Sequence, residues 1–411
     1  MDVKLKKCFN LILLGFLLLW PAVDTLNGYF YYQDASFVSI SAPYKAVGFI
    51  FIVILMLLYY PYRFFQFLLL VATISFCLIY QIAVYEEISE SVAWAVRGLL
   101  TMALLLYLIS EKGENVFWTR KKIVNLMLFY FFVMAVNVAL GVAGVGESQY
   151  AGGIGGKGFI IAGNEMSYLM LASASVVLFH TSIKKNVWIL IAVFLAFFLF
   201  FLMKATKAAM LGVLLIFFFS LVFNGFFKVK RLPVIYGTGL LVGLAALVLG
   251  YQFIQSTGLL DRIQYLYKLH DGFWGALLSG RVAFVQDAFY QVISHFNVAD
   301  AVLGIGVDEL RRIRGSIVEI DVIDVFITFG LVGPIIFYLP WIMGLFWSVG
   351  LMSKNLKNGA CFVLLLLTLI GVSLTAGHVV NSGIASSATA FLMYYIYLNK
   401  RESVDSQRRN P

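Results

Sequence analysis

Residues 187–227 read VWILIAVFLAFFLFFLM, then KATK, then AAMLGVLLIFFFSLVFNGFF. The two outer runs carry no charged residue, and each has close to the roughly 20 helical residues that cross about 30 Å of hydrocarbon. The four residues between them include two lysines. The stretch therefore predicts two membrane-spanning helices joined by a short polar turn.

Similar apolar runs recur along the chain, which is 62% hydrophobic and 12% charged with a mean hydropathy of +0.92. This composition excludes a soluble monomer and indicates a polytopic membrane protein. About 12 spans are expected, because an apolar helix of about 20 residues crosses a bilayer. They lie at residues 9–23, 46–60, 64–84, 92–109, 123–143, 159–179, 187–203, 208–227, 232–253, 322–349, 361–376 and 384–398.

The expected fold class is all-α. The alternating ten-residue segments of a membrane barrel are missing from the sequence, and in lipid every backbone polar group must be satisfied within the protein. The chain then divides into spans one to nine (1–253), a long polar loop (254–321), spans ten to twelve (322–398) and a polar tail (399–411).

Basic residues predict the orientation of the spans. Lysine and arginine are dense in alternate short connections, such as residues 4–7, 120–122 and 228–231. Short cytoplasmic loops carry this excess in membrane proteins. Alternation from a cytoplasmic N-terminus places about 19 of the 30 basic residues inside and about 16 of the 21 acidic residues at or beyond the outer face. Both termini are therefore expected inside and residues 254–321 outside.

Other signals narrow the protein class. The basic start and the apolar run before Pro21 are compatible with a signal peptide, but no small-x-small cleavage site follows, so this run is expected to be the first span. Cys8, Cys77 and Cys361 lie in or beside apolar runs and indicate no disulfide or zinc framework. The inward basic bias explains the net charge of +9 without a nucleic-acid partner. No GxxxxGK[ST] or HExxH motif is present, and ATP hydrolysis is not expected.

Several cations on the expected outer face are candidates for binding a diphosphate. Lys204 and Lys207 lie where positive charge is disfavoured, so they either bind phosphate or extend to lipid phosphates. Arg281 stands alone within SGRVAF, whereas Arg311 and Arg314 belong to a cluster. Guanidinium groups clamp phosphates through paired donors, although each arginine is also compatible with a solvated surface. Arg281 is a better candidate than any single member of the cluster.

Carboxylates precede the expected span 322–349 in the segment VEIDVIDVFITFGLVG. Glu319, Asp321 and Asp324 are more than helix capping requires, although acids in a first turn are favoured by the helix dipole. A carboxylate held near the membrane can have a raised pKa suited to a general base. The three carboxylates are therefore candidates for a general base.

Two further outward segments are candidates for the same pocket. GGIGGKGFIIAGNE (152–165) ends in Asn164 and Glu165, and its glycines either permit close approach to an anionic head group or form a flexible hairpin loop. The turn GHVVNSG (377–383) contains His378 and Asn381. The histidine is equally compatible with a packing or hydrogen-bonding role.

The order of these elements resembles the O-antigen polymerase and ligase superfamily of bacterial envelope glycan enzymes. The resemblance covers residues 158–386: GFIIAGNEMSYLM, KATKAAMLG, SGR ending at Arg281, GIG at 304–306, EIDVIDVFITFGLVG and AGHVVNSG. In the ligases a histidine followed by Asn, Ser or Gln precedes a GxxG by nine residues. Here Gly330 and Gly333 supply the GxxG, and Glu319 stands at the histidine position. An acidic ExD at this point looks more like the polymerase branch.

The resemblance implies a GT-C-like, metal-independent inverting glycosyltransferase without a cofactor, on the outer face of the bacterial cytoplasmic membrane. It would transfer glycan from undecaprenyl diphosphate to a sugar hydroxyl of a second lipid-linked repeat unit. Lys207 and Arg281, helped by Arg311 or Arg314, would bind the diphosphate. Glu319, or Asp321 in its place, would accept the hydroxyl proton. The implied partners are the lipid-linked oligosaccharide and the bilayer, with a flippase and a chain-length regulator as candidates.

Two alternatives remain open. A ligase of the same superfamily would move finished glycan onto another acceptor. A secondary transporter or glycan flippase would also suit about 12 spans with both termini inside, but carrier sites lie near the membrane midplane, whereas the polar residues here gather at one face. The product could be O-antigen, capsule or exopolysaccharide.

Overall fold

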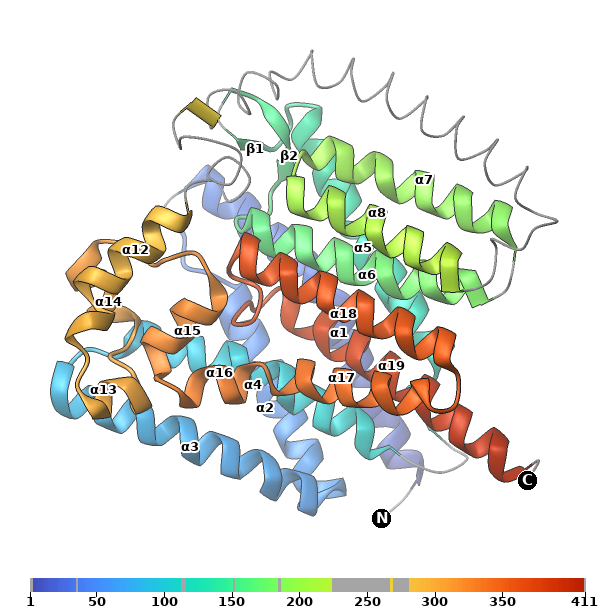
Figure 1. The fold of residues 1–411 in the computed structure, drawn as a ribbon, viewed down its shortest axis with the longest axis horizontal. Helices are drawn as coiled ribbons and strands as arrows, with labels where there is room; N and C mark the ends of the chain where they lie inside the picture. Colours follow the sequence, from blue (N-terminus) through green and yellow to red (C-terminus); the bar gives the residue numbers. More distant parts are fainter. Residues whose placement is uncertain are drawn as a thin grey trace.

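The computed structural model describes residues 3–34, 36–111, 116–150, 152–183, 186–223, 267–268 and 281–409 (Figure 1). The elements are α1 (Val3–Gln33), α2 (Ser41–Tyr59), α3 (Pro61–Tyr85), α4 (Ser89–Ser110), α5 (Arg120–Val142), β1 (Glu147–Tyr150), β2 (Ile154–Gly158), α6 (Gly163–Ile183), α7 (Val187–Lys204), α8 (Lys207–Phe223), α12 (Arg281–Gln291), a 3-10 turn (Ile293–His295), α13 (Val298–Leu303), α14 (Val307–Arg314), α15 (Asp321–Phe329), α16 (Val332–Phe337), α17 (Leu339–Met352), α18 (Leu356–Ala376) and α19 (Ala385–Arg409).

Within the described ranges, eight helices are long and apolar enough to cross a membrane, namely α1 to α7 and α18. Two shorter apolar helices, α8 and α17, run beside them. The predicted helical, membrane-embedded class is confirmed, with one small β-hairpin added. The predicted span 232–253 and the end of span 208–227 lie outside the described residues. The figure of 12 spans and the GT-C likeness stay predictions.

Helices α4 and α6 form the centre of the bundle, because most of their residues are buried. Helix α6 packs against α5, α7, α8, α18 and α19, and α4 packs against α2, α3 and α19. By contrast, α2 and α3 expose large apolar side chains such as Phe65, Leu69 and Phe76. A face of this kind is unfavourable in water and suited to lipid, which agrees with the membrane assignment.

The predicted span 322–349 is not one helix, and this expectation was wrong. The chain forms α15, α16 and α17 in succession. Gly330 ends α15 with a left-handed φ of 59°, and a Cβ there would lie 2.1 Å from the carbonyl carbon of Val302. Helix α17 begins with Pro340 in its first turn, where the missing N–H is tolerated. Backbone packing against α13 and a proline therefore divide a segment that reads as continuous in the sequence.

The predicted long loop is helical where it is described. Helices α12 and α14 pack with α15 around a small separate apolar core that includes Ala288, Leu310 and Ile327. The hydroxyls of Tyr80 and Tyr85 on α3 donate to Asp300 Oδ1 over 2.7 and 2.6 Å. These contacts fix the segment against one end of the bundle, at the left in Figure 1.

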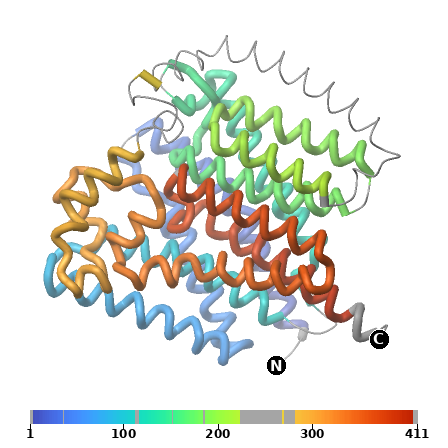
Figure 2. The backbone as a smooth tube through the Cα atoms, in the orientation of Figure 1, coloured from blue at the N-terminus to red at the C-terminus, as the bar shows by residue number. Residues whose placement is uncertain are grey.

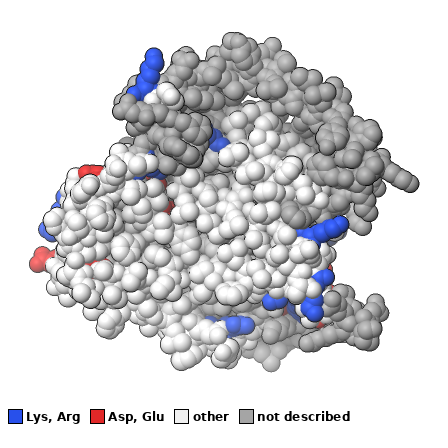
Figure 3. Space-filling view, in the orientation of Figure 1, with Lys and Arg blue, Asp and Glu red and all other residues white. Residues whose placement is uncertain are grey.

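The two ends of the bundle differ in composition. The start of α1 and the end of α19 lie at the same end of the bundle, as the backbone trace in Figure 2 also shows. At this terminal end, Lys6 and Arg120 form salt bridges with Glu111 and Glu402. Figure 3 shows Lys and Arg beside the termini, a broad uncharged face across the helices, and charges of both signs again around α12–α14. We call the end opposite the termini the cavity end.

The glycine-rich stretch forms an antiparallel hairpin that pairs Ser148 with Gly156 and Tyr150 with Ile154. A Cβ on Gly156 would lie 2.1 Å from the Val138 carbonyl oxygen on α5. The glycines therefore permit close packing of β2 on α5. Because the hairpin and a short turn occupy residues 147–162, α6 begins at Gly163, and the expected start of this span at residue 159 was too early.

Candidate functional site

The carboxyl of Asp321 is fully engaged by the turn between α18 and α19. Asp321 is 2% exposed and accepts hydrogen bonds from the amides of Val379 (2.9 Å) and Val380 (3.2 Å) and from the Ser373 hydroxyl (2.5 Å). Burial raises the pKa of this carboxyl, while those hydrogen bonds act to lower it. With its oxygens occupied, Asp321 is placed to hold the turn that contains His378.

Asp324 has a similar role one turn later. It is 1% exposed, and its Oδ1 accepts the Val318 amide over 2.7 Å. Asp324 thus fixes the residue before Glu319, and Asp321 fixes the turn that contains His378. Glu319 itself stays half exposed, at 45% of its side chain. Of the predicted catalytic pair, Glu319 is the member that a substrate can reach.

Glu319 and His378 lie in strained backbone. Their φ angles are 64° and 60°, a left-handed region that non-glycine residues rarely adopt and that costs about 1–3 kcal/mol. Gly377 packs so closely on this segment that a Cβ would lie 2.4 Å from the Glu319 carbonyl oxygen. Strain of this kind persists where the surroundings impose it, often at functional sites. The fold therefore brings together two segments that are 59 positions apart in the sequence.

Arg281, the first residue of α12, faces the same place. Its Nη2 lies 3.3 Å from Glu319 Oε2, and Nη1 donates to the Thr375 carbonyl oxygen at the end of α18. The Arg281 side chain is 12% exposed, so it is mostly shielded from water. The structure thus places the favoured arginine beside the favoured carboxylate.

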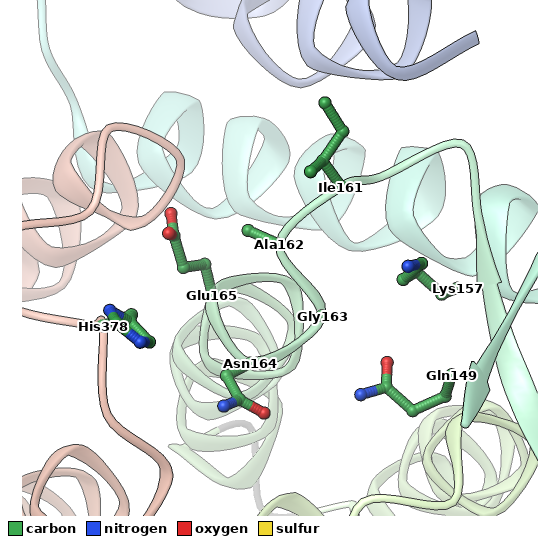
Figure 4. Close-up of a pocket in the computed structure, with 8 residues that line it drawn as sticks. All are labelled: Gln149, Lys157, Ile161, Ala162, Gly163, Asn164, Glu165 and His378. Carbon is green, nitrogen blue, oxygen red and sulfur yellow. The ribbon is translucent and has the colours of Figure 1, made fainter. Parts of the chain in front are cut away.

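A cavity of about 260 Å³ opens next to His378, whose turn packs on Glu319 (Figure 4). His378 lines one side, Asn164 and Glu165 at the start of α6 lie between, and Gln149 and Lys157 of the hairpin line the other. The Glu165 carboxylate accepts a hydrogen bond from the Ser382 hydroxyl. Three of the four predicted pocket residues therefore line one cavity.

Asn381, the fourth predicted pocket residue, is buried in the turn between α18 and α19 and does not line the cavity. Gln149 and Lys157 were missed as site residues. Lys157 stands within the glycine-rich stretch GGIGGKG, and only the hairpin places it at the cavity. For Gln149 the sequence carries no signal, because its place depends on the pairing of β1 with β2.

Lys204 ends α7 at 0% exposure and donates from Nζ to Gln149 Oε1. Ala205 follows with a left-handed φ of 59°. A Cβ on Gly155 would lie 2.6 Å from the Lys204 carbonyl oxygen, so the hairpin packs directly on the KATK turn. Lys207 begins α8 just after this turn and is half-buried.

The other two predicted arginines are engaged elsewhere. Arg311 forms a salt bridge with Glu90 at the start of α4, and Arg314 Nε lies 2.8 Å from Asp287 Oδ2 on α12. Arg314 is only 3% exposed. Both contacts hold α14 against neighbouring helices. This arrangement favours a structural role for the cluster over a role in binding diphosphate.

The described residues hold no group of three or more His, Cys, Asp or Glu side chains that could bind a metal ion. What they do bring together is a cation, a half-exposed carboxylate and a histidine beside a cavity. No protein-family model matches the chain, and no curated protein matches it. The functional assignment is therefore inferred from this arrangement and from the sequence.

Proposed function

We propose that this protein polymerises lipid-linked oligosaccharide repeat units at the outer face of the bacterial cytoplasmic membrane. The observation that carries the proposal is the contact between Arg281 and Glu319, 3.3 Å apart at the cavity end. A phosphate-binding cation beside a half-exposed carboxylate is what glycosyl transfer from a diphosphate requires. The basic residues beside the termini support a cytoplasmic terminal end, which would place the cavity end outside.

In the proposed reaction, Glu319 accepts the proton of an acceptor sugar hydroxyl. The hydroxyl oxygen attacks the anomeric carbon of the donor glycan from the face opposite the phosphate, and a new glycosidic bond forms. The bond between that carbon and the phosphate oxygen breaks, with inversion. Arg281 stabilises the negative charge that develops on the departing undecaprenyl diphosphate. Removal of a general base of this kind typically lowers the rate about 10²–10⁴-fold.

His378 favours a second candidate within the same superfamily. It lines the cavity, and its turn packs on the Glu319 backbone. A histidine is a general base near neutral pH, so ligase-type transfer of finished glycan is also chemically possible here. Polymerase and ligase differ in their products, and this difference makes them separable in cells.

The experiment compares Glu319→Gln and Arg281→Ala in a strain deleted for the chain, with surface glycan resolved by size on a gel. Both variants should stall at a single repeat unit, while wild type restores a ladder. The matched control is Arg312→Ala, because Arg312 is 71% exposed and pairs with Glu309 away from the cavity. Membrane abundance of each variant is measured in parallel.

Other outcomes reassign the function. Long polymer that stays on its carrier lipid in the variants would support the ligase. A ladder unchanged in both variants would reject this site, and transport of the lipid-linked glycan would be tested next. Loss of signal in the Arg312→Ala control as well would point to a general folding defect.

A further inference from the structure

Lys204 is a buried lysine whose described hydrogen-bond partner is neutral. Its side chain is 0% exposed, and the acceptor for its Nζ is the amide oxygen of Gln149. Burial of an ammonium group is costly unless an opposite charge compensates it. Within the described ranges, no salt bridge reaches Lys204. A bound anion would supply such compensation.

A second lysine strengthens this electrostatic demand. Lys157 is on β2, which pairs with the strand that carries Gln149, the partner of Lys204, and no salt bridge among the described residues reaches Lys157 either. Its Nζ lies 5.4 Å from the centre of the Tyr32 ring. Two neighbouring ammonium groups stabilise a shared anion and destabilise each other without one.

The surrounding backbone fixes these groups in position. Gly155 allows β2 to pack directly on the carbonyl of Lys204, and the left-handed Ala205 turns the chain there. Gln149 and Lys157 both line the cavity wall, and Lys204 lies behind Gln149 as its hydrogen-bond donor. Because Gln149 Oε1 accepts from Lys204, its Nε2 is the donor of that side chain left for a ligand.

These cations lie on the side of the cavity away from His378. In Figure 4, Gln149 and Lys157 are on one side of Asn164 and Glu165, and His378 is on the other. His378 belongs to the turn that packs on Glu319, the partner of Arg281. The cavity therefore has a cationic side with Lys157 and, across from it, a side with His378, whose turn leads to Glu319 and Arg281.

We infer that Lys157 and Gln149, with Lys204 behind Gln149, form a second anion site, which binds the phosphate-bearing group of the acceptor lipid. The inference rests on the proposed function, because a polymerase uses two lipid-linked diphosphates. The donor diphosphate is bonded to the reacting carbon and must lie beside Arg281 and Glu319. The acceptor hydroxyl belongs to a sugar chain, so the acceptor diphosphate lies away from the reaction centre and needs a separate cationic site.

The test is the stoichiometry of radiolabelled inorganic diphosphate bound to the purified full-length protein in detergent. Wild type should bind two equivalents. Lys157→Ala and Arg281→Ala should each bind one, and the double variant none. Lys157→Arg should restore the second equivalent, and Lys354→Ala, an exposed lysine in the turn between α17 and α18, should bind two. Two equivalents in Lys157→Ala, or one or none in wild type, would overturn the second site.

Competing lipids identify the source of the anion. Undecaprenyl diphosphate should displace the label that depends on Lys157, whereas phosphatidylglycerol should not. Displacement by phosphatidylglycerol would overturn the assignment to the acceptor, because the site would then bind membrane lipid head groups.

The polymerase function and the second anion site are tested by different measurements. A glycan ladder that persists in Glu319→Gln would reject the polymerase, whereas the count of bound diphosphate would still decide whether the second anion site exists.

Discussion

Two glutamates at opposite ends of the bundle show how differently one side chain is used. Glu111, at the terminal end, is 1% exposed and accepts from Asn10 (2.9 Å) and from the amides of Phe117 and Trp118 (3.0 and 3.2 Å). Glu319, at the cavity end, is 45% exposed, contacts Arg281 and lies in strained backbone. A satisfied buried carboxylate joins helices, whereas a strained and accessible one is available for chemistry.

The largest effect on stability is expected at Glu111. Glu111→Ala removes the acceptor shared by α1 and the segment before α5, and breaking a buried ionic network costs about 3–5 kcal/mol. The free energy of unfolding of the purified protein in detergent measures this loss. Glu402→Ala is the matched control, because Glu402 is 56% exposed and its salt bridge with Arg120 should contribute at most about 1 kcal/mol. Equal losses in both variants would remove the proposed distinction between the two ends.

Asp321 combines features of the two glutamates, because it is buried like Glu111 and lies at the cavity end like Glu319. Asp321→Ala leaves the amides of Val379 and Val380 without their acceptor, at a cost of about 1–3 kcal/mol. The turn that carries His378 should loosen, and glycan should stall at a single repeat unit. Asp321→Asn keeps one oxygen acceptor and should recover part of both stability and ladder. If Asp321→Asn were as stable as wild type but fully inactive, Asp321 would be a general base instead of a positioning residue.

The hydrogen bonds from α3 to Asp300 of α13 should contribute less to the free energy of unfolding. Tyr85→Phe removes the hydroxyl that donates to Asp300 over 2.6 Å, which should cost about 0.5–1.5 kcal/mol. Tyr80→Phe removes the parallel contact at 2.7 Å and should cost a similar amount. Thermal unfolding of both single variants and the double variant measures their coupling. A double variant as stable as wild type would show that α12–α14 are held by other contacts.

The sequence predicted the helical membrane class because apolar runs of spanning length are a local property. It also singled out Arg281 as a cation that stands alone, and Glu319 as one of three carboxylates before an apolar segment and by its place in the family pattern. It failed in residues 322–349, where the break at Gly330 depends on contact with Val302 of a distant helix. It also ranked Asp321 beside Glu319 as a catalytic residue. The burial of Asp321 against the turn of Val379 is a tertiary contact, so the sequence does not distinguish the two carboxylates.

The smallest effect is expected in the arginine cluster of α14, where neighbouring residues have opposite exposures. Arg314 is 3% exposed and pairs with Asp287 on another helix, whereas Arg312 is 71% exposed and pairs with Glu309 on its own helix. Arg312→Ala should leave the unfolding temperature and the glycan ladder unchanged, because an exposed pair within one helix is screened by solvent. Arg314→Ala should lower the unfolding temperature and leave binding of diphosphate at two equivalents. Loss of one bound diphosphate equivalent in Arg314→Ala would indicate that the arginine cluster binds diphosphate. It would weaken the assignment of the anion sites to Arg281 and the lysines.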